Sequence, residues 1–333
     1  MNDLITLAHG NGGRFMRELI KNIFARHFSN PDLDIAADAA SLPAQSGPLA
    51  FTTDGFIVDP LEFPGGDIGS LAVHGTVNDL AVSGATPRWL SVSCFIEEGF
   101  EIARLDRIAA SMGRAARDCG VAIVTGDTKV VPRGQGGGLY LAVSGIGVRD
   151  AEIKLGMSQI RPNDRLLVSG TLGDHGTAIL LARHEFGLHG DLRSDSASVL
   201  PFAQAAMRVA GLRFMRDPTR GGIATVAHEI SLATKCRVTL DDASMPIREQ
   251  ARGICDMLGY DPLYLASEGR IAAVVAAESA ASLLAAWRSL PGGGRAAIIG
   301  RIETGRPLVA LRTELGGERL LDELEDDPLP RIC

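Results

Sequence analysis

The sequence lacks three features that would each assign it to a particular class of protein. No apolar run approaches the roughly 18 residues that a membrane-spanning helix needs. The first residues, Met1-Asn2-Asp3-Leu4, have neither the basic nor the apolar region of a signal peptide. No Gly-x-x-x-x-Gly-Lys-Ser/Thr motif occurs, so a Walker-type phosphate loop is excluded. We therefore expect no membrane segment and no leader.

Paired cysteines and an excess of basic charge are also missing. The cysteines form no Cys-x-x-Cys pair and are odd in number, which excludes a disulfide framework and a structural zinc site. A net charge of −7 argues against a general binder of nucleic acid or of anionic membranes. We expect a cytoplasmic protein whose four internal cysteines are small core residues. These are Cys94, Cys119, Cys236 and Cys255.

The fifth cysteine, Cys333, is the last residue, and nothing around it resembles a core. An acidic stretch, residues 321–329, precedes it and should be solvated and mobile. Pro328 and Pro330 should stiffen this tail into an extended segment. A thiol at its tip can reach a site on its own chain or on a partner. The alternative is a terminus without function.

The charges around Cys333 should make its thiol unreactive. Its own terminal carboxylate and the acidic tail disfavour the thiolate, whereas Arg331 favours it. We expect a pKa above the usual ~8.5 until a partner docks the tail.

The length predicts about two domains, and polar residues follow short apolar strands in both halves. Near the N-terminus, His9-Gly10-Asn11-Gly12-Gly13 opens a helix and can form an anion site, although a simple turn explains it equally well. His9 is expected to be structural. Residues 49–53 form a strand that ends in Asp54, and strand 121–125 is followed by a loop, Gly126-Asp127-Thr128-Lys129, where α/β proteins often place chemistry.

A helix over residues 71–83 is apolar nearly all round and should be buried, yet it carries His74, Asn78 and Asp79. A buried carboxylate must be paired or coordinate a metal, so Asp79 is either a ligand or a satisfied structural residue. For His74 we expect a structural role. If Asp38, Asp54, Asp79 and Asp127 converge, they form a magnesium cradle for a triphosphate.

The second half repeats this arrangement. The turns that carry polar residues there are Gly170-Thr171-Leu172-Gly173-Asp174-His175-Gly176, Asp217-Pro218-Thr219-Arg220-Gly221-Gly222 and Ser267-Glu268-Gly269. We divide the chain into an N-terminal glycine-rich loop and helix (1–38), a nucleotide-binding domain (39–155), a second α/β domain (156–315) and a tail (316–333).

Several of these strings together resemble the HypE family, the carbamoyl dehydratases of nickel–iron hydrogenase maturation. They run in order from the glycine loop to the last residue: Thr52-Thr53-Asp54, Phe63-Pro64-Gly65-Gly66-Asp67-Ile68-Gly69, Gly75-Thr76-Val77-Asn78-Asp79-Leu80-Ala81, Gly126-Asp127-Thr128-Lys129-Val130-Val131, Asp217-Pro218-Thr219-Arg220-Gly221-Gly222 and Pro330-Arg331-Ile332-Cys333. The family belongs to the superfamily of aminoimidazole ribonucleotide synthetase, selenophosphate synthetase and thiamine monophosphate kinase.

The resemblance implies a homodimer that associates through the sheet of the first α/β domain, with ATP bound near the dimer interface. It implies that HypF places a carboxamide on the sulfur of Cys333. ATP then dehydrates this group to a thiocyanate, and the cyano group passes to iron on the HypC–HypD complex.

The resemblance also implies roles for individual residues. Asp54, Asp79, Asp127 and Asp38 would hold magnesium. Cys333, Lys129 and Glu268 would be catalytic, and which of the last two removes the proton is open. The implied ATP contacts are Gly12, Gly13, Asn78, Gly126, Thr128 and Asp217.

Two other functions remain open. A small-molecule phosphotransferase of the same superfamily would not need the terminal cysteine. A non-catalytic thiol carrier would use Cys333 but would neither bind nor turn over a nucleotide.

Overall fold

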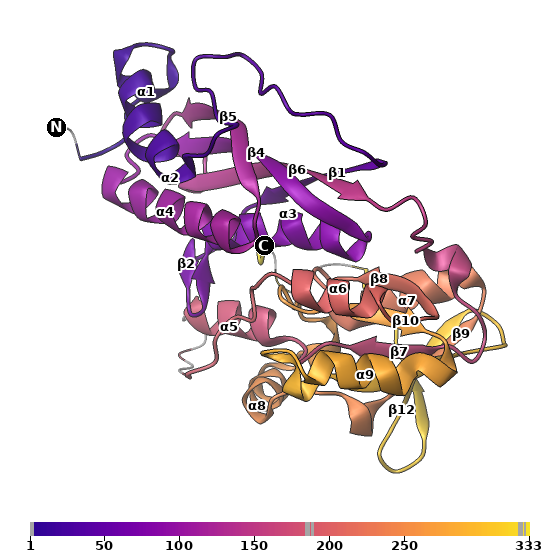
Figure 1. Ribbon diagram of the computed structural model, residues 1–333. Coiled ribbons are helices and arrows are strands. Elements are labelled where there is room, and N and C mark those ends of the chain that lie inside the picture. The colour runs from indigo at the N-terminus through magenta and orange to yellow at the C-terminus, as the bar shows by residue number, and fades with distance from the viewer. Residues whose placement is uncertain (1–2, 184–186, 188–189, 326–328, 330) are drawn as a thin grey trace.

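The computed structural model describes residues 3–183, 187, 190–325, 329 and 331–333. It consists of two α/β units stacked on each other, with the C-terminus between them (Figure 1). This confirms the α/β layers that the sequence predicts for both halves. In the described part of the chain, no helix is both long and apolar enough to cross a bilayer. Pro328 and Pro330 lie outside the described residues.

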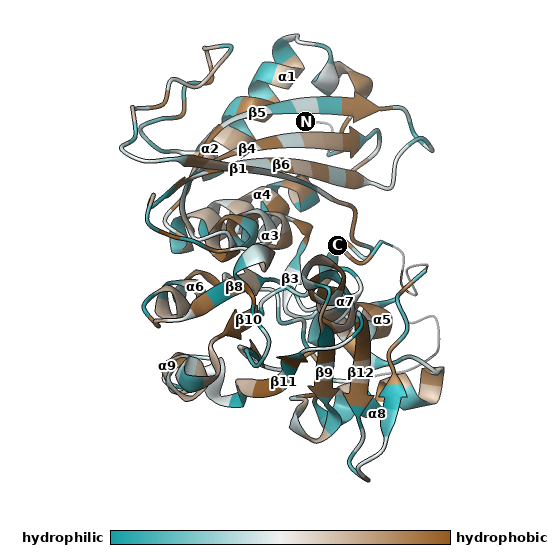
Figure 2. Cartoon of the chain, turned by 90° about the vertical axis from the view of Figure 1, so that its right-hand side faces the viewer, coloured by the Kyte–Doolittle hydropathy of each residue, from teal (hydrophilic) through white to brown (hydrophobic). Residues whose placement is uncertain are grey.

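A four-stranded sheet with the order β1-β6-β4-β5 forms the first unit. Its strands are β1 (Leu49–Phe56), β4 (Ala85–Glu97), β5 (Ala122–Val131) and β6 (Leu139–Arg149), of which β4 and β5 are parallel and the other neighbours antiparallel. Helices α3 (Ile68–Val82) and α4 (Ile102–Asp118) lie on the side of the sheet that faces the second unit (Figure 2). Short elements precede the sheet or join its strands: η1 (Leu7–Gly10), α1 (Arg14–Leu19), η2 (Ile20–Phe24), α2 (Ala25–Phe28), β2 (Glu62–Phe63) and β3 (Gly66–Asp67).

Helix α3 is buried on all sides, as its sequence predicts. Asp67 caps it by accepting a hydrogen bond from the backbone N–H of Ser70 at 2.8 Å. One side of α3 packs on the sheet and another contacts α6 (Leu200–Met207) of the second unit. An apolar helix without a polar face suits this position between two layers.

The opposite face of the first sheet is open in a single copy of the chain. Leu49, Phe51 and Phe95 are 62%, 68% and 41% exposed there. Side chains alternate between the two faces of a strand, so the neighbours of these residues point to α3 and α4. Asp54 and Phe56 of β1 belong to that covered face, next to Val143 of β6.

The loop predicted at Gly126-Asp127-Thr128-Lys129 is wrong, because β5 continues through it to Val131. These residues pair with β4, and a Cβ at Gly126 would collide with the carbonyl oxygen of Val92. The glycine therefore permits close approach of two backbones, not a turn.

A seven-stranded sheet with the order β13-β12-β9-β11-β7-β10-β8 forms the second unit. Its strands are β7 (Arg165–Val168), β8 (Leu212–Arg216), β9 (Arg237–Asp241), β10 (Ala272–Val275), β11 (Ala297–Glu303), β12 (Leu308–Arg312) and β13 (Glu318–Leu320), and only β9 and β12 are parallel neighbours. The remaining helices are α5 (Asp174–Ala182), α7 (Gly222–Thr234), α8 (Glu249–Leu258) and α9 (Ala280–Arg288). On β7, Leu166 and Val168 pack with α7, whereas Leu167 packs with α6 and α9. The sheet is thus covered on both faces.

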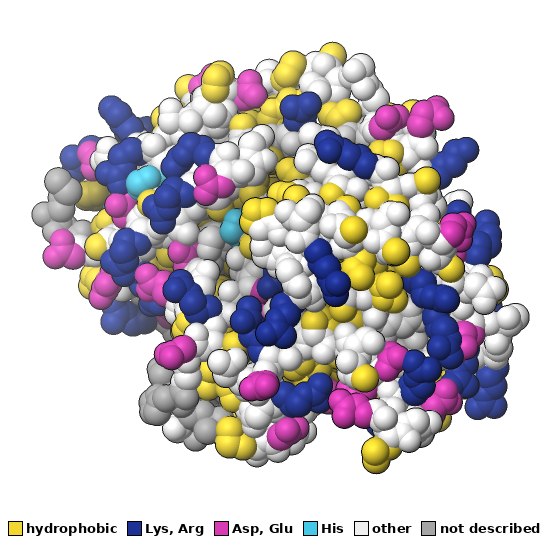
Figure 3. All heavy atoms as spheres, turned by 60° about the horizontal axis from the view of Figure 1, so that its bottom comes forward, with side chains coloured by type: hydrophobic (Ala, Val, Ile, Leu, Met, Phe, Trp, Pro, Cys, Tyr) yellow, Lys and Arg dark blue, Asp and Glu magenta, His cyan; other side chains and the backbone are white. Residues whose placement is uncertain are grey.

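Basic and acidic side chains are interspersed on the face shown in Figure 3, with hydrophobic side chains between them. Exposed ion pairs of the second unit include Arg319–Asp261 and Arg237–Glu318, both at 2.6 Å. Such pairs contribute little to stability, so the two cores hold the fold.

The tail is docked rather than solvated, which corrects the expectation for Cys333. Leu329, Ile332 and Cys333 are buried in a core cluster that consists mostly of first-unit residues and includes Ile179 and Leu265 of the second unit. Residues 331–333 lie antiparallel to residues 57–59: Asp59 N–H donates to the Arg331 carbonyl and Ile57 N–H to the terminal carboxylate of Cys333, both at 3.1 Å. Local composition could not indicate this, because the cover comes from residues far away in the sequence.

Of the predicted domain boundaries, the structure bears on the start of the tail at residue 316. β13 extends the second sheet beyond residue 315, so the tail proper is shorter than predicted. The other boundaries stay predictions.

Candidate active site

The end of the tail reaches a cavity of about 200 Å³ between the two units. The first unit contributes β1 and α3, and the second contributes the turn before α7 and the turn at Glu268. The lining residues are Asp54, Gly55, Phe56, Gly75, Asp79, Arg216, Asp217, Thr219, Arg220, Glu268 and Cys333. Four acidic residues predicted for the site, each from a different segment of the chain, are therefore brought together with the terminal thiol.

Three aspartates on one side of this cavity repel one another. Burial raises the pKa of Asp54 to about 6, and the charge of Asp79 adds to the shift. Burial raises the pKa of Asp217 to about 7, again with Asp79 contributing. Asp79 accepts a hydrogen bond from the Thr52 hydroxyl at 2.7 Å. Carboxylates held together in this way suit a bound cation, which would relieve their repulsion.

Glu268 lies deeper and is 2% exposed. Burial raises its pKa well above the ordinary value of 4.5, and the charges of Asp217, Asp195 and Asp54 raise it further. Its Oε1 is buried and has no hydrogen-bond partner among the described residues. Its surroundings therefore favour the protonated carboxyl group, and Oε1 is left as an unused polar atom.

The side chain of Asn78, on α3 of the first unit, makes hydrogen bonds to the second unit. Its side-chain amide donates to the carbonyls of Glu268 at 3.1 Å and Ala197 at 3.0 Å, and its oxygen accepts from Val199 N–H at 2.8 Å. Both amide hydrogens are used, so Asn78 joins the two units and positions the Glu268 backbone. Its predicted contact with ATP stays a prediction.

The thiol of Cys333 faces Arg220, whose Nε donates to Sγ at 3.3 Å. Burial raises the pKa of Cys333 from 9.0 to about 12; Glu268 adds to this shift and Arg220 opposes it. The predicted direction agrees, but its causes do not. Arg331, expected to favour the thiolate, instead lies near Asp59 at 3.6 Å.

Cys333 should therefore react very slowly with iodoacetamide in the isolated protein at pH 8. Three pKa units above its ordinary value lower the thiolate fraction about 10³-fold. The alkylation rate of Cys333 is compared with that of a free peptide of residues 325–333. The half-buried Cys236 serves as an internal reference for the activity of the reagent. A rate equal to that of the peptide, or a measured pKa well below 8, would show that the tail is not docked.

A second cavity, of about 140 Å³, lies at the β5 edge of the first sheet. Its polar wall includes Asp34, Asp127 and Thr128, with Gly126 beside them. Its apolar wall comes from the N-terminal helices and the segment after them, with Met16, Ile20, Phe24, Phe28, Leu33 and Ile35. Such a half-apolar, half-polar pocket suits a ligand with a flat ring and a polar group.

Asp127 and Lys129 form an ion pair at 2.7 Å, and each side chain is about half exposed, 50% and 57%. The hydrogen bond from Lys129 lowers the pKa of Asp127. The predicted glycines, Gly12 and Gly13, are exposed near this edge, with nothing packed against their Cα atoms, and Gly12 has a φ of +75°. His9 accepts a hydrogen bond from Thr6 N–H at 3.0 Å, consistent with a structural role.

The four predicted aspartates do not converge within one copy of the chain. Asp54, Val143, Val92 and Gly126 form one row across the sheet, so Asp54 and the neighbourhood of Asp127 are three strand spacings apart, roughly 14 Å. Asp127 pairs with Ser93 in the next row, whose side chains point away from α3. Asp38 is exposed and lines neither cavity. Strand parity explains the error, because sequence alone did not place Asp54 and Asp127 on opposite faces.

The cavity beside Cys333 nevertheless fits a magnesium–nucleotide. Among the residues that the structure describes, no three His, Cys, Asp or Glu side chains are arranged to hold an ion by themselves. Magnesium commonly uses one or two carboxylates and takes its other ligands from water and phosphate. Asp54 and Asp79 supply such a pair, and the cation's charge would compensate the repulsion that raises the pKa of Asp54.

Arg220 is the main residue of the cavity to which the sequence assigned no role. It lies in the turn Asp217–Gly222, three residues after the candidate Asp217. A basic residue so close to a candidate aspartate could have indicated a place in the site. Gly221 and Gly222 have φ of +72° and +58°, and a Cβ at Gly222 would collide with the Leu263 carbonyl. This backbone holds Arg220 over the thiol.

Two family models match the chain. The N-terminal domain of AIR synthase related proteins matches residues 36–149, and the C-terminal domain matches residues 161–311. The carbamoyl dehydratase HypE of Cupriavidus necator is 47% identical over 332 residues, which cover 99% of this chain and 95% of that protein. The carbamoyl dehydratase HypE of Escherichia coli strain K12 is 45% identical, with 99% of each chain covered.

Solved structures give the same result. A hydrogenase maturation protein HypE in complex with ATP has a TM-score of 0.94 and 45% identity, covering 98% of this chain and 99% of that one. A structure of a HypE–HypF complex has a TM-score of 0.81 and 39% identity, covering 92% and 99%. The thiamine-monophosphate kinase of Stenotrophomonas maltophilia K279a, at 23% identity, a TM-score of 0.66 and coverage of 89% and 95%, shares the fold alone.

Proposed function

This chain belongs to the HypE family of carbamoyl dehydratases, and from that premise we propose that it uses ATP to dehydrate a carboxamide on the sulfur of Cys333. The observation that carries the proposal is the position of the thiol. Cys333 lies inside an acidic cavity, next to the guanidinium of Arg220 and to Glu268, whose Oε1 has no hydrogen-bond partner among the described residues. A terminus without function would be expected at the surface, not buried among charged side chains.

The reaction balances as loss of one water. The carboxamide oxygen attacks the γ-phosphorus of ATP and ADP leaves. Phosphorylation turns a poor leaving group into a good one, and the C–O bond then breaks as both N–H protons are removed. The products are a thiocyanate on Cys333, ADP and phosphate, and the oxygen leaves with the phosphate.

Glu268 is the base we propose for the nitrogen-bound protons. It is close enough to raise the pKa of Cys333 by its charge, and its Oε1 has no partner among the described residues. It must first ionise, and the charges of Asp217 and Asp54 oppose this. Asp54 and Asp79 would hold magnesium, with Asp217 as a further polar contact, and the cation would screen these carboxylates and the phosphates.

A second copy of the chain explains the separate position of Asp127 and Lys129. We propose that the open face of the first sheet, with Leu49, Phe51 and Phe95, is covered by the same face of a partner subunit. Exposed apolar side chains gathered on one sheet face are typical of an interface. The edges of the sheet are β1 and β5, which carry Asp54 and Asp127. Two sheets related by a two-fold axis can place β5 of one copy beside β1 of the other.

In such a dimer the β5 cavity of one copy and the Cys333 cavity of the other form one nucleotide site. Gly12, Gly13, Gly126 and Thr128 would then contact ATP from the β5 side. Asp127 would bind magnesium, and Lys129 would align the phosphates. Asp38 stays a prediction without structural support.

Mixed dimers test this arrangement. Asp54→Asn and Asp127→Asn variants should each lose magnesium–nucleotide binding with the fold intact. When the two are co-expressed, about half of the randomly formed pairs carry one intact shared site, so ATP-dependent water loss should partly return. Each variant alone is the control. Absence of any recovery, with mixed pairs verified by mass, would place each site within one copy.

The partners follow from the proposed reaction. HypF would supply the carboxamide, as the related HypE–HypF complex supports. The HypC–HypD complex would accept the cyano group, because breaking its bond to the Cys333 sulfur returns the thiol only if another group takes the cyanide. We propose the cytoplasm as the compartment, since all five cysteines are free thiols.

The intact mass of the protein tests the proposal. Incubation with HypF and its carbamoyl donor should add one carboxamide to Cys333, and magnesium–ATP given to the isolated product should then remove one water. A stable carboxamide in the presence of magnesium–ATP would support a thiol carrier instead. Phosphorylation of an added small molecule without Cys333 chemistry would support a phosphotransferase.

A further inference from the structure

The turn Gly173-Asp174-His175-Gly176 takes no part in the proposed reaction, yet it touches the tail. His175 lies in the first turn of α5 and is fully buried. Its Nε2 is 2.7 Å from the carbonyl oxygen of Ile332, the residue before Cys333. Phe63 packs edge-on against the imidazole, with ring centroids 5.4 Å apart.

The hydrogen bonds around His175 fix its tautomer. A carbonyl oxygen only accepts, so Nε2 carries the hydrogen and donates it to Ile332. Nδ1 then accepts from the Ser194 hydroxyl at 2.8 Å, and Ser194 Oγ in turn accepts from the Ser196 N–H at 3.0 Å. Burial lowers the pKa of His175 to about 4, which keeps the ring neutral.

This contact acts on the thiol through the peptide plane. The Ile332 carbonyl, the Cys333 nitrogen and the Cys333 Cα lie in one plane, because the peptide bond is rigid. The bond from His175 to the Ile332 oxygen holds this plane on one side of Cys333, and the bond from Ile57 N–H to the terminal carboxylate holds the residue on the other. The direction of the Cα–Cβ bond of Cys333 is then determined, and the hydrogen bond from Arg220 Nε favours the side-chain rotamer that places Sγ in the cavity.

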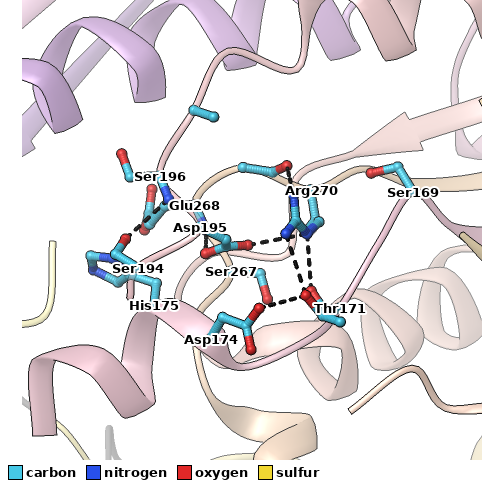
Figure 4. A network of polar contacts seen from close by, with 12 residues as sticks. Ser169, Thr171, Asp174, His175, Ser194, Asp195, Ser196, Ser267, Glu268 and Arg270 are labelled. Atoms are coloured by element: carbon cyan, nitrogen blue, oxygen red, sulfur yellow. Dashed lines mark hydrogen bonds and ion pairs between the residues drawn. The ribbon is translucent and has the colours of Figure 1, made fainter. Parts of the chain in front are cut away.

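The segment of residues 194–196, which holds His175 through Ser194, also positions Glu268. Between Ser194 and Ser196, Asp195 accepts a hydrogen bond from Glu268 N–H at 3.1 Å and pairs with Arg270 at 3.5 Å (Figure 4). Residues 194–196 therefore support both the tail, through His175, and the carboxyl group next to the sulfur. Gly176 leaves room for the tail, since a Cβ there would lie 3.3 Å from Ile332 Cδ1.

We propose that His175 is a positioning residue for the dehydration, and that its neutral imidazole holds the Ile332 carbonyl so that the Cys333 sulfur rests between Glu268 and Arg220. This inference rests on the proposed function of the cavity. It adds a requirement on the tail: the backbone bonds from residues 57–59 and the bond from Arg183 to the Arg331 carbonyl do not set the pose of Cys333 without the bond from His175.

The test compares His175→Leu, which removes the donor, with His175→Gln, which restores one. The matched control is His228→Leu, because His228 makes a similar bond to the Leu321 carbonyl at 3.0 Å, remote from the thiol. Two quantities are measured on the full chain: the iodoacetamide rate of Cys333 relative to Cys236, and the single-turnover rate of water loss from the carbamoylated protein at saturating ATP.

In His175→Leu we expect Cys333 to be alkylated roughly tenfold faster, the scale of one buried hydrogen bond, and water loss to slow by a similar factor. ATP affinity should not change. His175→Gln should restore most of both rates, and His228→Leu should change neither. Ser194→Ala, which leaves Nδ1 without its donor, should shift both rates in the direction of His175→Leu.

Unchanged alkylation and water loss in His175→Leu would overturn the inference, as would equal effects in His228→Leu. If His175→Leu does not fold, Ser194→Ala decides, and wild-type rates in it count against the proposal. The alkylation rate of Cys333 tests the anchoring of the tail even if the protein does not catalyse the dehydration. A wild-type protein that loses no water would refute the proposed function while leaving the anchoring of the tail testable.

Discussion

Cys333→Ala should bind ATP normally and yield no carbamoylated or cyanated protein. The sulfur is the atom to which the carboxamide is attached, and no other cysteine lines the cavity. Cys255→Ala, which alters a buried thiol elsewhere, is the matched control and should keep full modification.

The effect of Cys333→Ala on stability should be small although the residue is buried. Only one sulfur atom is removed. A Leu→Ala truncation in a core lowers the free energy of unfolding by about 2–5 kcal/mol, and the decrease here should be smaller. The backbone bonds of the tail to Ile57, Asp59 and His175 remain. Loss of ATP binding or a core-sized destabilisation would mean that the terminal residue is structural, and continued thiocyanate formation would remove Cys333 from the reaction.

Glu268→Gln should slow water loss from the carbamoylated protein by about 10²–10⁴-fold, the usual contribution of a general base. Glutamine has the same shape but cannot take a proton from the amide nitrogen. Carbamoylation by HypF and ATP affinity should persist, since neither needs this base. The control is Glu249→Gln, which removes a carboxylate from an exposed helix start. A wild-type rate in Glu268→Gln would assign the proton transfer to another group, with Lys129 the first alternative.

The same substitution has an opposite effect on stability. The pKa of Glu268 is raised in the folded state, so the folded protein holds this proton when the unfolded chain, with its ordinary value of 4.5, has lost it. Stability then decreases as pH rises above the unfolded value. Glu268→Gln should be more stable than wild type at pH 7.5, and the difference in Tm should shrink towards pH 4. A lower Tm at pH 7.5 would contradict the burial of an uncompensated carboxyl group.

The sequence predicted those parts of the site that depend on residue type and local pattern. The apolar helix α3 with Asp79, the strand carrying Asp54, the turns at Asp217 and Glu268 and the terminal Cys333 all meet in the observed cavity. The family resemblance is confirmed by relatives over nearly the whole chain. Each of these signals is visible within about ten residues of sequence.

The parts that could not be predicted depend on contacts between distant segments. The string Gly126-Asp127-Thr128-Lys129 reads as a loop until β4 is beside it, and a register shift near Val124 sets which face Asp127 occupies. The docked tail uses backbone carbonyls, which have no sequence signature. His175 was visible only as a histidine between glycines, because its partner is the Ile332 carbonyl 157 residues away.

The central claim is that the amide oxygen leaves as part of phosphate, and isotope tracing tests it most directly. The protein is carbamoylated on Cys333 with ¹⁸O in the carboxamide, freed of HypF, and given magnesium–ATP in unlabelled water. We expect one ¹⁸O atom in the released phosphate for each thiocyanate formed. Phosphate without label, with the ¹⁸O in water or still on the protein, would contradict it.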